Sequence, residues 1–153
     1  MGVYTAATIP TTVVESLLET YWDVQGGSVP APTVIVPNDL VTPIRYDLRV
    51  ADYVLVKHDS TAEVEEPIGT WIYANRTYRI LLEMSTNANR QRLWDIKDEI
   101  RRIVHDKRHS LTGFQRIQYR SFTEQMDEQQ RIWRGNIQLE LLSSAVLMDT
   151  ENT

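Results

Sequence analysis

The chain has 153 residues, about the length of one globular domain, and its apolar share of 42% is enough for a hydrophobic core. It contains no cysteine, which excludes disulfide bridges, thiolate metal sites and cysteine nucleophiles. Its longest apolar runs, such as Tyr53 to Val56, fall far short of the about 20 residues that span a membrane, and its first residues carry no export or lipid-anchor signal. We therefore expect one folded domain over residues 1–153, with flexible tails at 1–10 and 149–153 and no membrane partner.

The charges are segregated along the sequence. The net charge is −5, yet residues 1–69 hold ten acids and three bases, whereas residues 90–120 hold nine bases and four acids. Thirteen of the sixteen bases are arginine, the residue that forms bidentate contacts with carboxylates and phosphates. An acidic and a basic region on one molecule favour two different partners, or contacts between copies of the chain. The simpler alternative is that both regions form solvated surfaces.

The first element predicted is a short helix. Thr12 and Glu15 have the spacing of a capping box, so the helix is expected to begin at Thr12. Apolar residues then recur at spacings of three and four, namely Val13, Val14, Leu17, Leu18 and Tyr21, and Gly26-Gly27 ends the pattern. A short edge strand over 34–36 follows, because Pro37 cannot donate to a strand ladder.

A second strand is predicted around Tyr53–Val56 and is followed by a long acidic stretch, residues 59–67. Glu63, Glu65 and Glu66 in this stretch are expected on an exposed loop or hairpin arm. The adjacent residues His58-Asp59-Ser60 have the types of a catalytic triad, but consecutive neighbours cannot adopt its relay geometry, and we expect a turn there.

Strands over 71–73 and 77–85 come next, and the second of them places Tyr78, Ile80, Leu82 and Met84 on one face. A long helix capped by Thr86 or Asn87 follows and is stopped by Gly113. Its apolar stripe comprises Leu93, Ile96, Ile100, Ile103 and Val104, and its opposite face carries the charged residues Arg92, Asp95, Lys97, Asp98, Arg101, Arg102 and Asp106. That face is either solvated or meets a charged neighbour.

Two strands over 114–122 and 131–142 close the chain, separated by the polar stretch 123–130. Alternation along the second of them places Trp133, Ile137, Leu139 and Leu141 on a buried face. The element order predicts an α+β fold: a single, mostly antiparallel sheet with one long and one short helix packed on it, and extended loops or hairpin arms.

No catalytic or cofactor signature is present. The six glycines form none of the spacings of nucleotide-binding or hydrolase motifs. His105 and His109 lie four residues apart, as in a two-histidine metal site, but Asp106 stands where that motif needs glutamate. A basic helix end that complements the helix dipole explains these histidines without a ligand. We predict no enzyme activity, no catalytic residue, no metal and no cofactor.

Nucleic-acid binding is an alternative. The basic region is followed by Phe114, Tyr119 and Phe122, and aromatic side chains stack on bases. The acid-rich remainder of the chain, with a pI of about 5.2, opposes this reading because it repels a phosphate backbone.

The combination of an acidic arm, a basic helix and no active-site signature favours an assembly component. Head-to-tail packing of the basic helix of one copy on the acidic arm of the next generates a ring when the rotation closes. The candidate interface residues are four bases and three acids: Arg101, Arg102, Lys107, Arg108, Glu63, Glu65 and Glu66.

The last half of the chain resembles the tail terminator or tail completion proteins of tailed viruses. The resemblance lies in a strand from Tyr78 to Thr86 (YRILLEMST), a helix from Arg92 to Val104 (RLWDIKDEIRRIV) and strands around 114–120 and 132–142. These are a succession of elements rather than diagnostic residues, so no functional residue is carried over.

The resemblance implies a homohexameric ring that caps the tail tube and ends its polymerisation. The implied partners are the tail tube protein, a neck or head-completion protein, and viral DNA that passes through the lumen without specific binding. The implied location is the tail or neck of the virion, with assembly in the host cytoplasm. A head-completion or neck adaptor protein shares every one of these arguments, and an enzyme would be recognised by a deep pocket with convergent polar groups.

Overall fold

The computed structural model describes residues 8–22, 29–37, 47–49, 51–68 and 73–146. They form two helices and one five-stranded sheet with strand order β1-β2-β3-β5-β4. The elements are α1 (Pro10–Tyr21), β1 (Thr33–Ile35), β2 (Tyr53–Ile68), β3 (Tyr73–Thr86), α2 (Arg90–Asp106), β4 (Arg116–Asp127) and β5 (Ile132–Val146). Every strand pair is antiparallel except β1–β2. The predicted α+β class, with one short and one long helix, is confirmed.

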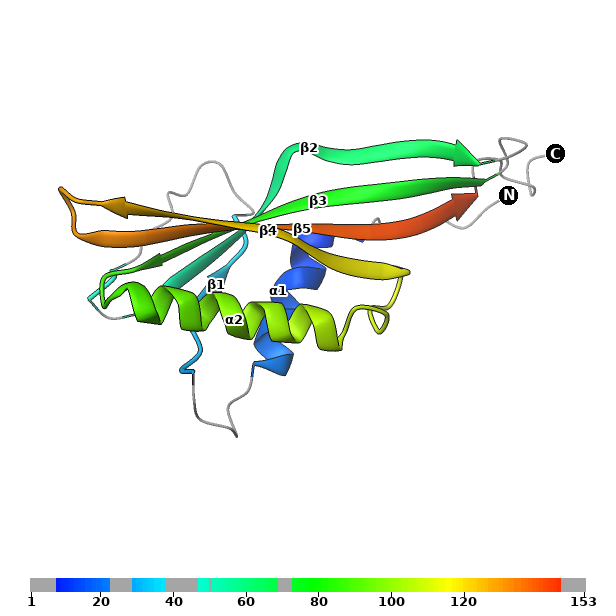
Figure 1. The fold of residues 1–153 in the computed structure, drawn as a ribbon. Helices are drawn as coiled ribbons and strands as arrows, with labels where there is room; N and C mark the ends of the chain where they lie inside the picture. The colour runs from blue at the N-terminus through cyan, green and yellow to red at the C-terminus, as the bar shows by residue number, and fades with distance from the viewer. Residues whose placement is uncertain (1–7, 23–28, 38–46, 50, 69–72, 147–153) are drawn as a thin grey trace.

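Both helices lie on the same face of the sheet, as Figure 1 shows, and the core fills the space between them and the strands. The alternation predicted for β3 and β5 holds, since Ile80, Leu82 and Met84 are buried, as are Ile137, Leu139 and Leu141. The predicted stripe of α2 packs onto them and is fully buried, from Leu93 to Val104. Of the predicted inward residues, Tyr78 and Trp133 are only partly buried, at the margin of the core.

The two helix starts differ from the prediction. α1 begins at Pro10, with Ile9 as a cap that makes no side-chain hydrogen bond, so the capping box at Thr12 is wrong. Proline suits this position because its missing N–H needs no partner in a first turn. α2 is capped by Asn89, whose side chain accepts from the Arg92 N–H at 2.7 Å, rather than by Thr86 or Asn87. It ends at Asp106, well before Gly113.

Three strands, β2, β4 and β5, extend further than predicted. The acidic stretch 59–67 belongs to β2, and the polar residues up to Asp127 belong to β4. The hairpin-arm reading of 59–67 is therefore right and the loop reading wrong. His58 and the two residues after it lie within β2 rather than in a turn, at an irregularity in the pairing with β3. A strand that is exposed on both faces has no apolar alternation, and this removes the sequence signal.

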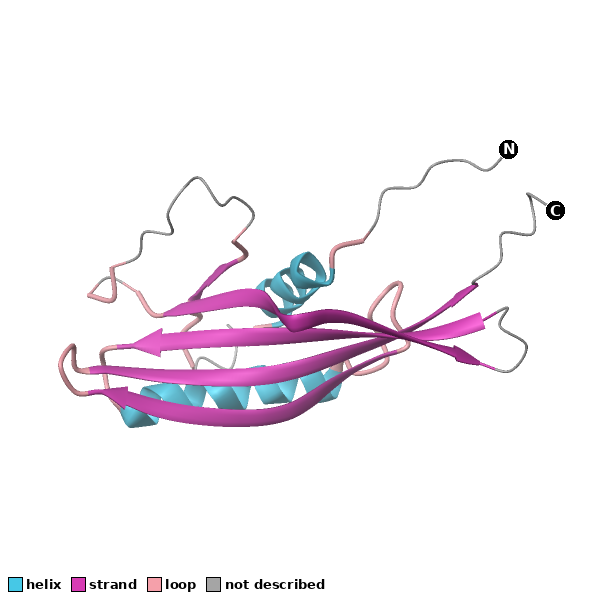
Figure 2. Cartoon of the chain, turned by 90° about the horizontal axis from the view of Figure 1, so that it is seen from above, coloured by secondary structure: helices cyan, strands magenta, loops and turns pink. Residues whose placement is uncertain are grey.

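The distal parts of β2, β3 and β5 project beyond both helices as a bare three-stranded extension, which is visible in Figures 1 and 2. We call residues 59–68, 73–77 and 142–146 the arm, and the helix-covered remainder the body. The predicted strand at 71–73 and the predicted tails fall largely outside the described residues, as does the Gly26-Gly27 helix end.

Candidate subunit interface

The predicted acids lie on the arm. Glu63, Glu65 and Glu66 are all exposed in the distal part of β2, where the pairing with β3 sets them opposite Tyr78, Arg76 and Asn75. Cross-strand partners share a face of the sheet. Because Tyr78 packs edge-on against Phe114 at the margin of the core, Glu63 and Glu65 lie on the helix side of the arm and Glu66 on the open side.

One of the three acids is neutralised within the chain. The Arg76 Nε–H donates to Glu65 Oε2 at 2.6 Å, and this hydrogen bond raises the pKa of Arg76. Glu63 and Glu66 have no ion-pair partner among the described residues. Arg76 was not predicted as a site residue, because the sequence does not reveal that it faces Glu65 across two strands. The arm remains net acidic, with two carboxylates available to a partner.

Two of the predicted bases lie against α1. Arg102 is paired with Glu99 and donates through Nη2 to the Tyr21 carbonyl at 3.0 Å. The Lys107 ammonium lies 4.4 Å from the centre of the Tyr21 ring, a cation–π contact. We call Arg102 and Lys107 the α1 flank of the basic region. Both side chains already have partners that hold the end of α2 to the end of α1.

Of the other two bases, Arg101 lies near β4, and Arg108 follows the end of α2, where its guanidinium donates to the His105 carbonyl at 3.2 Å and lines the same hollow as Arg102. Arg101 is exposed and close enough to Tyr119 to act on its phenol: burial raises the pKa of Tyr119, and the Arg101 charge opposes that rise. The Arg108 carbonyl accepts the Ile117 N–H of β4 at 2.9 Å. We call Arg101 and Arg108 the β4 flank. The structure therefore divides the predicted basic patch into two flanks.

Two further arginines, which were not singled out from the sequence, lie on β4 itself. Arg116 and Arg120 are both exposed, and the first acid along β4 is Glu124. Arg120 lies 3.6 Å from Glu140 on β5, whereas Arg116 has no ion-pair partner among the described residues. The sequence shows them only as two bases four residues apart in a predicted strand, and the fold places both on the helix-free face of β4, whereas Arg101 lies on α2.

Acids and bases thus lie at opposite sides of one sheet. β4 is an edge strand, and β2 is the outermost strand wherever β1 does not cover it, which is everywhere beyond Leu55. The predicted acids and the arginines of β4 therefore lie at different edges of the sheet, although each edge also carries charges of the other sign, such as Lys57 on β2 and Glu124 on β4.

A cluster of contacts around Trp94 and Lys97 fixes α2 to the sheet. It shows that the predicted position of Lys97 was wrong. Lys97 was predicted on the solvated face of the helix, but it is buried, with its ammonium 4.3 Å from the Trp94 ring centre and 2.5 Å from Asp98. Trp94 stacks edge-on against Phe122 at 5.2 Å and donates its indole N–H to Glu124, which also pairs with Arg90. Each of these contacts has a structural role in holding α2 against β4.

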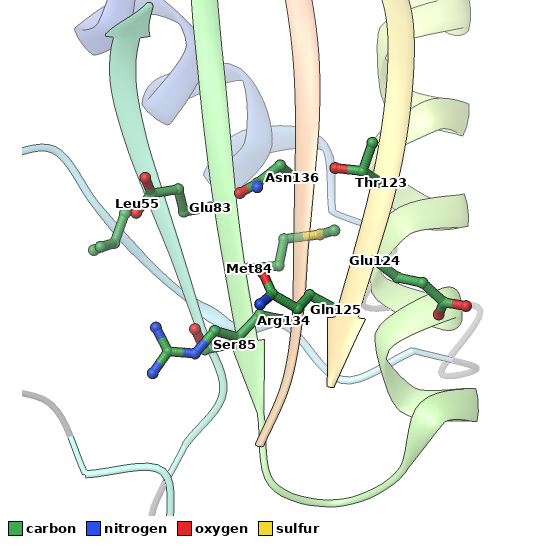
Figure 3. A pocket seen from close by; sticks show the side chains of 9 residues that line it. All are labelled: Leu55, Glu83, Met84, Ser85, Thr123, Glu124, Gln125, Arg134 and Asn136. Carbon is green, nitrogen blue, oxygen red and sulfur yellow. The ribbon is translucent and has the colours of Figure 1, made fainter. Parts of the chain in front are cut away.

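The hollows of the surface are shallow. The one in Figure 3, about 410 Å³, lies over β2, β3, β5 and β4 and is lined mainly by polar side chains such as Ser85, Thr123 and Asn136. Its carboxylate Glu83 is paired with Lys57 at 2.9 Å. The described ranges hold no group of three His, Asp or Glu that could bind a metal, and His105 and His109 are both exposed. None of the helices in those ranges is long and apolar enough to cross a membrane.

Comparison with known proteins adds no family assignment. No protein-family model matches the chain, and no curated protein matches it. The functional argument therefore depends on the geometry of the arm and of the two edges.

Proposed function

We propose that this chain is a structural protein of virion assembly, a ring-forming tail terminator that caps the tail tube and joins it to the neck. The observation that supports the proposal is the placement of free acids and free bases at opposite edges of one sheet. A surface of this kind is complementary to itself in a head-to-tail sense. Head-to-tail contacts produce a closed ring when a whole number of the rotations that relate neighbouring copies adds up to one full turn.

The contact is formed by the arm of one copy and the basic region of the next. The β4 flank is the part of that region with free charge, because Arg102 and Lys107 already bind Glu99 and Tyr21. The projecting arm supplies the reach, since its strands extend past both helices (Figure 2). The ring is expected to be a hexamer that binds the tail tube on one side and a neck protein on the other, with DNA passing through its lumen.

The first test is the native mass of the full chain over a range of concentration and ionic strength. A discrete hexamer that dissociates as salt rises supports a charge-complementary ring, because exposed ion pairs weaken with screening. A monomer under every condition overturns the preformed ring. Arg101→Glu with Arg108→Glu should weaken assembly and leave the fold intact, whereas Arg102→Glu would also break the contacts of Arg102 with Glu99 and the Tyr21 carbonyl.

The position of the ring in the virion is tested separately. Co-sedimentation with purified tail tubes distinguishes a terminator from a head-side adaptor, which binds portal rings instead. A salt titration of DNA binding addresses the remaining alternative: tight binding with a steep salt dependence identifies a nucleic-acid-binding protein and contradicts passage of DNA without specific binding.

A further inference from the structure

Two strands of the sheet have outer edges that no described strand occupies. β1 pairs with β2 only from Tyr53 to Leu55, so the outer edge of β2 is free over 56–68 as far as the described residues show. β4 pairs with β5 on its inner side, and in the described ranges its outer edge is engaged once, where the Ile117 N–H bonds Arg108. A free strand edge presents a row of backbone donors and acceptors that another strand can complete.

The charges along the two free edges run in the same order from the N-terminal to the C-terminal end of each strand. Along β2 the bases come first, at Lys57 and His58, and the acids Glu63, Glu65 and Glu66 follow. Along β4 the bases also come first, at Arg116 and Arg120, and the acids Glu124 and Asp127 follow. An antiparallel alignment sets the acids of β2 beside the bases of β4 and the bases of β2 beside the acids of β4. A parallel alignment sets like charges together at both ends.

The strand order of the sheet also requires that β2 of one copy pair antiparallel with β4 of the next. β2 and β3, β3 and β5, and β5 and β4 are each antiparallel, so β4 runs opposite to β2 within one chain. A second copy placed beside β4 with its own β2 edge inward, and its helices on the same face, therefore pairs with β4 in the antiparallel sense. A parallel pairing would require the helices of the two copies to lie on opposite faces.

From these observations we infer that the outer edge of β2 in one copy pairs antiparallel with the outer edge of β4 in the next, so that the sheet continues from subunit to subunit. This inference rests on the proposed ring, and it names the surface by which a second copy of the chain binds. An antiparallel pair of two β2 edges or of two β4 edges also sets acids beside bases, but such a contact is isologous and closes as a dimer. The head-to-tail pair of β2 with β4 is the contact that propagates into the proposed ring.

Features that usually protect an exposed edge are present on β2, and they refine the inference. Pro67, the glutamates and the irregularity after His58 all discourage pairing with an arbitrary strand. A partner strand that places arginines beside the glutamates, as β4 does in the antiparallel sense, overcomes the charge barrier.

The first test is charge reversal with rescue in the full-length protein. Arg116→Glu with Arg120→Glu is expected to raise the concentration at half assembly by about tenfold or more. Adding Glu63→Arg and Glu66→Arg to the same chain should restore most of the assembly. The matched control is Arg49→Glu with Arg131→Glu, which changes the net charge equally on exposed residues outside β2 and β4 and should leave assembly unchanged.

The second test uses the absence of native cysteine, so that two introduced thiols are the only ones present. Glu66→Cys with Gln118→Cys, two positions on the helix-free face, should form intermolecular disulfides under mild oxidation and give a ladder of covalent oligomers. Glu66→Cys with Gln125→Cys places the second thiol toward the other end of β4 and should give little ladder. Circular dichroism and a sharp unfolding transition verify that each variant is folded.

The outcomes separate this inference from the ring itself. A wild-type chain that is monomeric under all conditions overturns both. A salt-sensitive ring that neither responds to reversal at Arg116 and Arg120 nor cross-links through Gln118 overturns the edge pairing and leaves the ring intact. Preferential cross-linking through Gln125 shows a parallel contact and likewise overturns the inference. Reversal, rescue and the Gln118 ladder together support it.

Discussion

The same three strands, β2, β3 and β5, have different surroundings in the body and in the arm. In the body every second residue is buried under a helix, as at Ile80, Leu82 and Met84 of β3. In the arm most side chains of β2 are exposed, although Ala74 of β3 is buried, and cross-strand neighbours are pairs such as Glu65 and Arg76. The body is therefore stabilised mainly by side-chain packing, whereas the arm depends more on its backbone ladder and on its continuity with the body. The exposed side chains of β2 in the arm are available to a partner.

The largest expected effect on stability comes from a carboxylate introduced into the core of the body, and a carboxylate introduced into the arm serves as the comparison. Ile100→Asp or Leu139→Asp puts an unpaired carboxylate into a site that is at most 1% exposed, and we expect a loss of about 4 kcal/mol or more, enough to unfold many domains. Val64→Asp in the arm should cost about 1 kcal/mol or less, because Val64 is only half-buried. Chemical denaturation measures both. A stable, soluble Ile100→Asp protein contradicts the assignment of the buried helix face.

This contrast also explains how much was predictable from the sequence. The body was recovered because burial on one face leaves a period in the sequence, as in Leu93, Ile96 and Ile100 for the helix and Ile137, Leu139 and Leu141 for the strand. The arm was recovered only as an acidic stretch, because a strand exposed on both faces, as β2 largely is there, has no such period. The division of the bases was not predictable, because helix periodicity separates residues 101 and 102 but does not reveal that Arg102 contacts α1 while Arg101 lies near Tyr119 of β4.

The second prediction concerns the closest packing in the body. A Cβ atom at Gly135 would lie 2.8 Å from Met84 Cε and 2.8 Å from Phe122 Cε2, under the side chain of Leu93. The Phe122 ring is held by Trp94 and Lys97 and cannot easily move aside. Gly135→Val should therefore cost about 2–3 kcal/mol by overpacking. Asn136→Ala, whose side chain is exposed, is the control, and equal losses in the two variants would contradict the packing argument.

A smaller effect tests the start of α2. Asn89 accepts the Arg92 N–H at 2.7 Å, and Asn89→Ala should lower the free energy of unfolding by about 1 kcal/mol. Asn87→Ala, at the cap position expected from the sequence, should change it by less than about 0.5 kcal/mol. Thermal unfolding of the two variants side by side provides the measurement. A larger loss of stability for Asn87→Ala than for Asn89→Ala would show that Asn87 caps α2.

The smallest effect is a dependence of stability on pH at the junction of α2 and β4. Hydrogen bonds from Arg90 and Trp94 hold the pKa of Glu124 below its ordinary value of 4.5. The folded state thus favours the ionised form, so this contribution is complete above the unfolded pKa and is lost as the pH falls through the folded one. Glu124→Gln should destabilise the protein more at pH 7 than at pH 3. Denaturation curves at both values measure the difference, and an equal loss at both contradicts the assignment.

The irregularity in β2 separates the arm from the body mechanically. His58 pairs with Ile80 and Glu63 with Tyr78, so residues 59–62 stand opposite Arg79 alone. Extra residues at such a point bend the strand and increase its local twist. Because regular pairing resumes on both sides, insertions or deletions among these residues alter the angle and reach of the arm while the core register remains unchanged. A lineage of such proteins can therefore adjust the curvature of an assembly through one short segment, without redesigning the hydrophobic core.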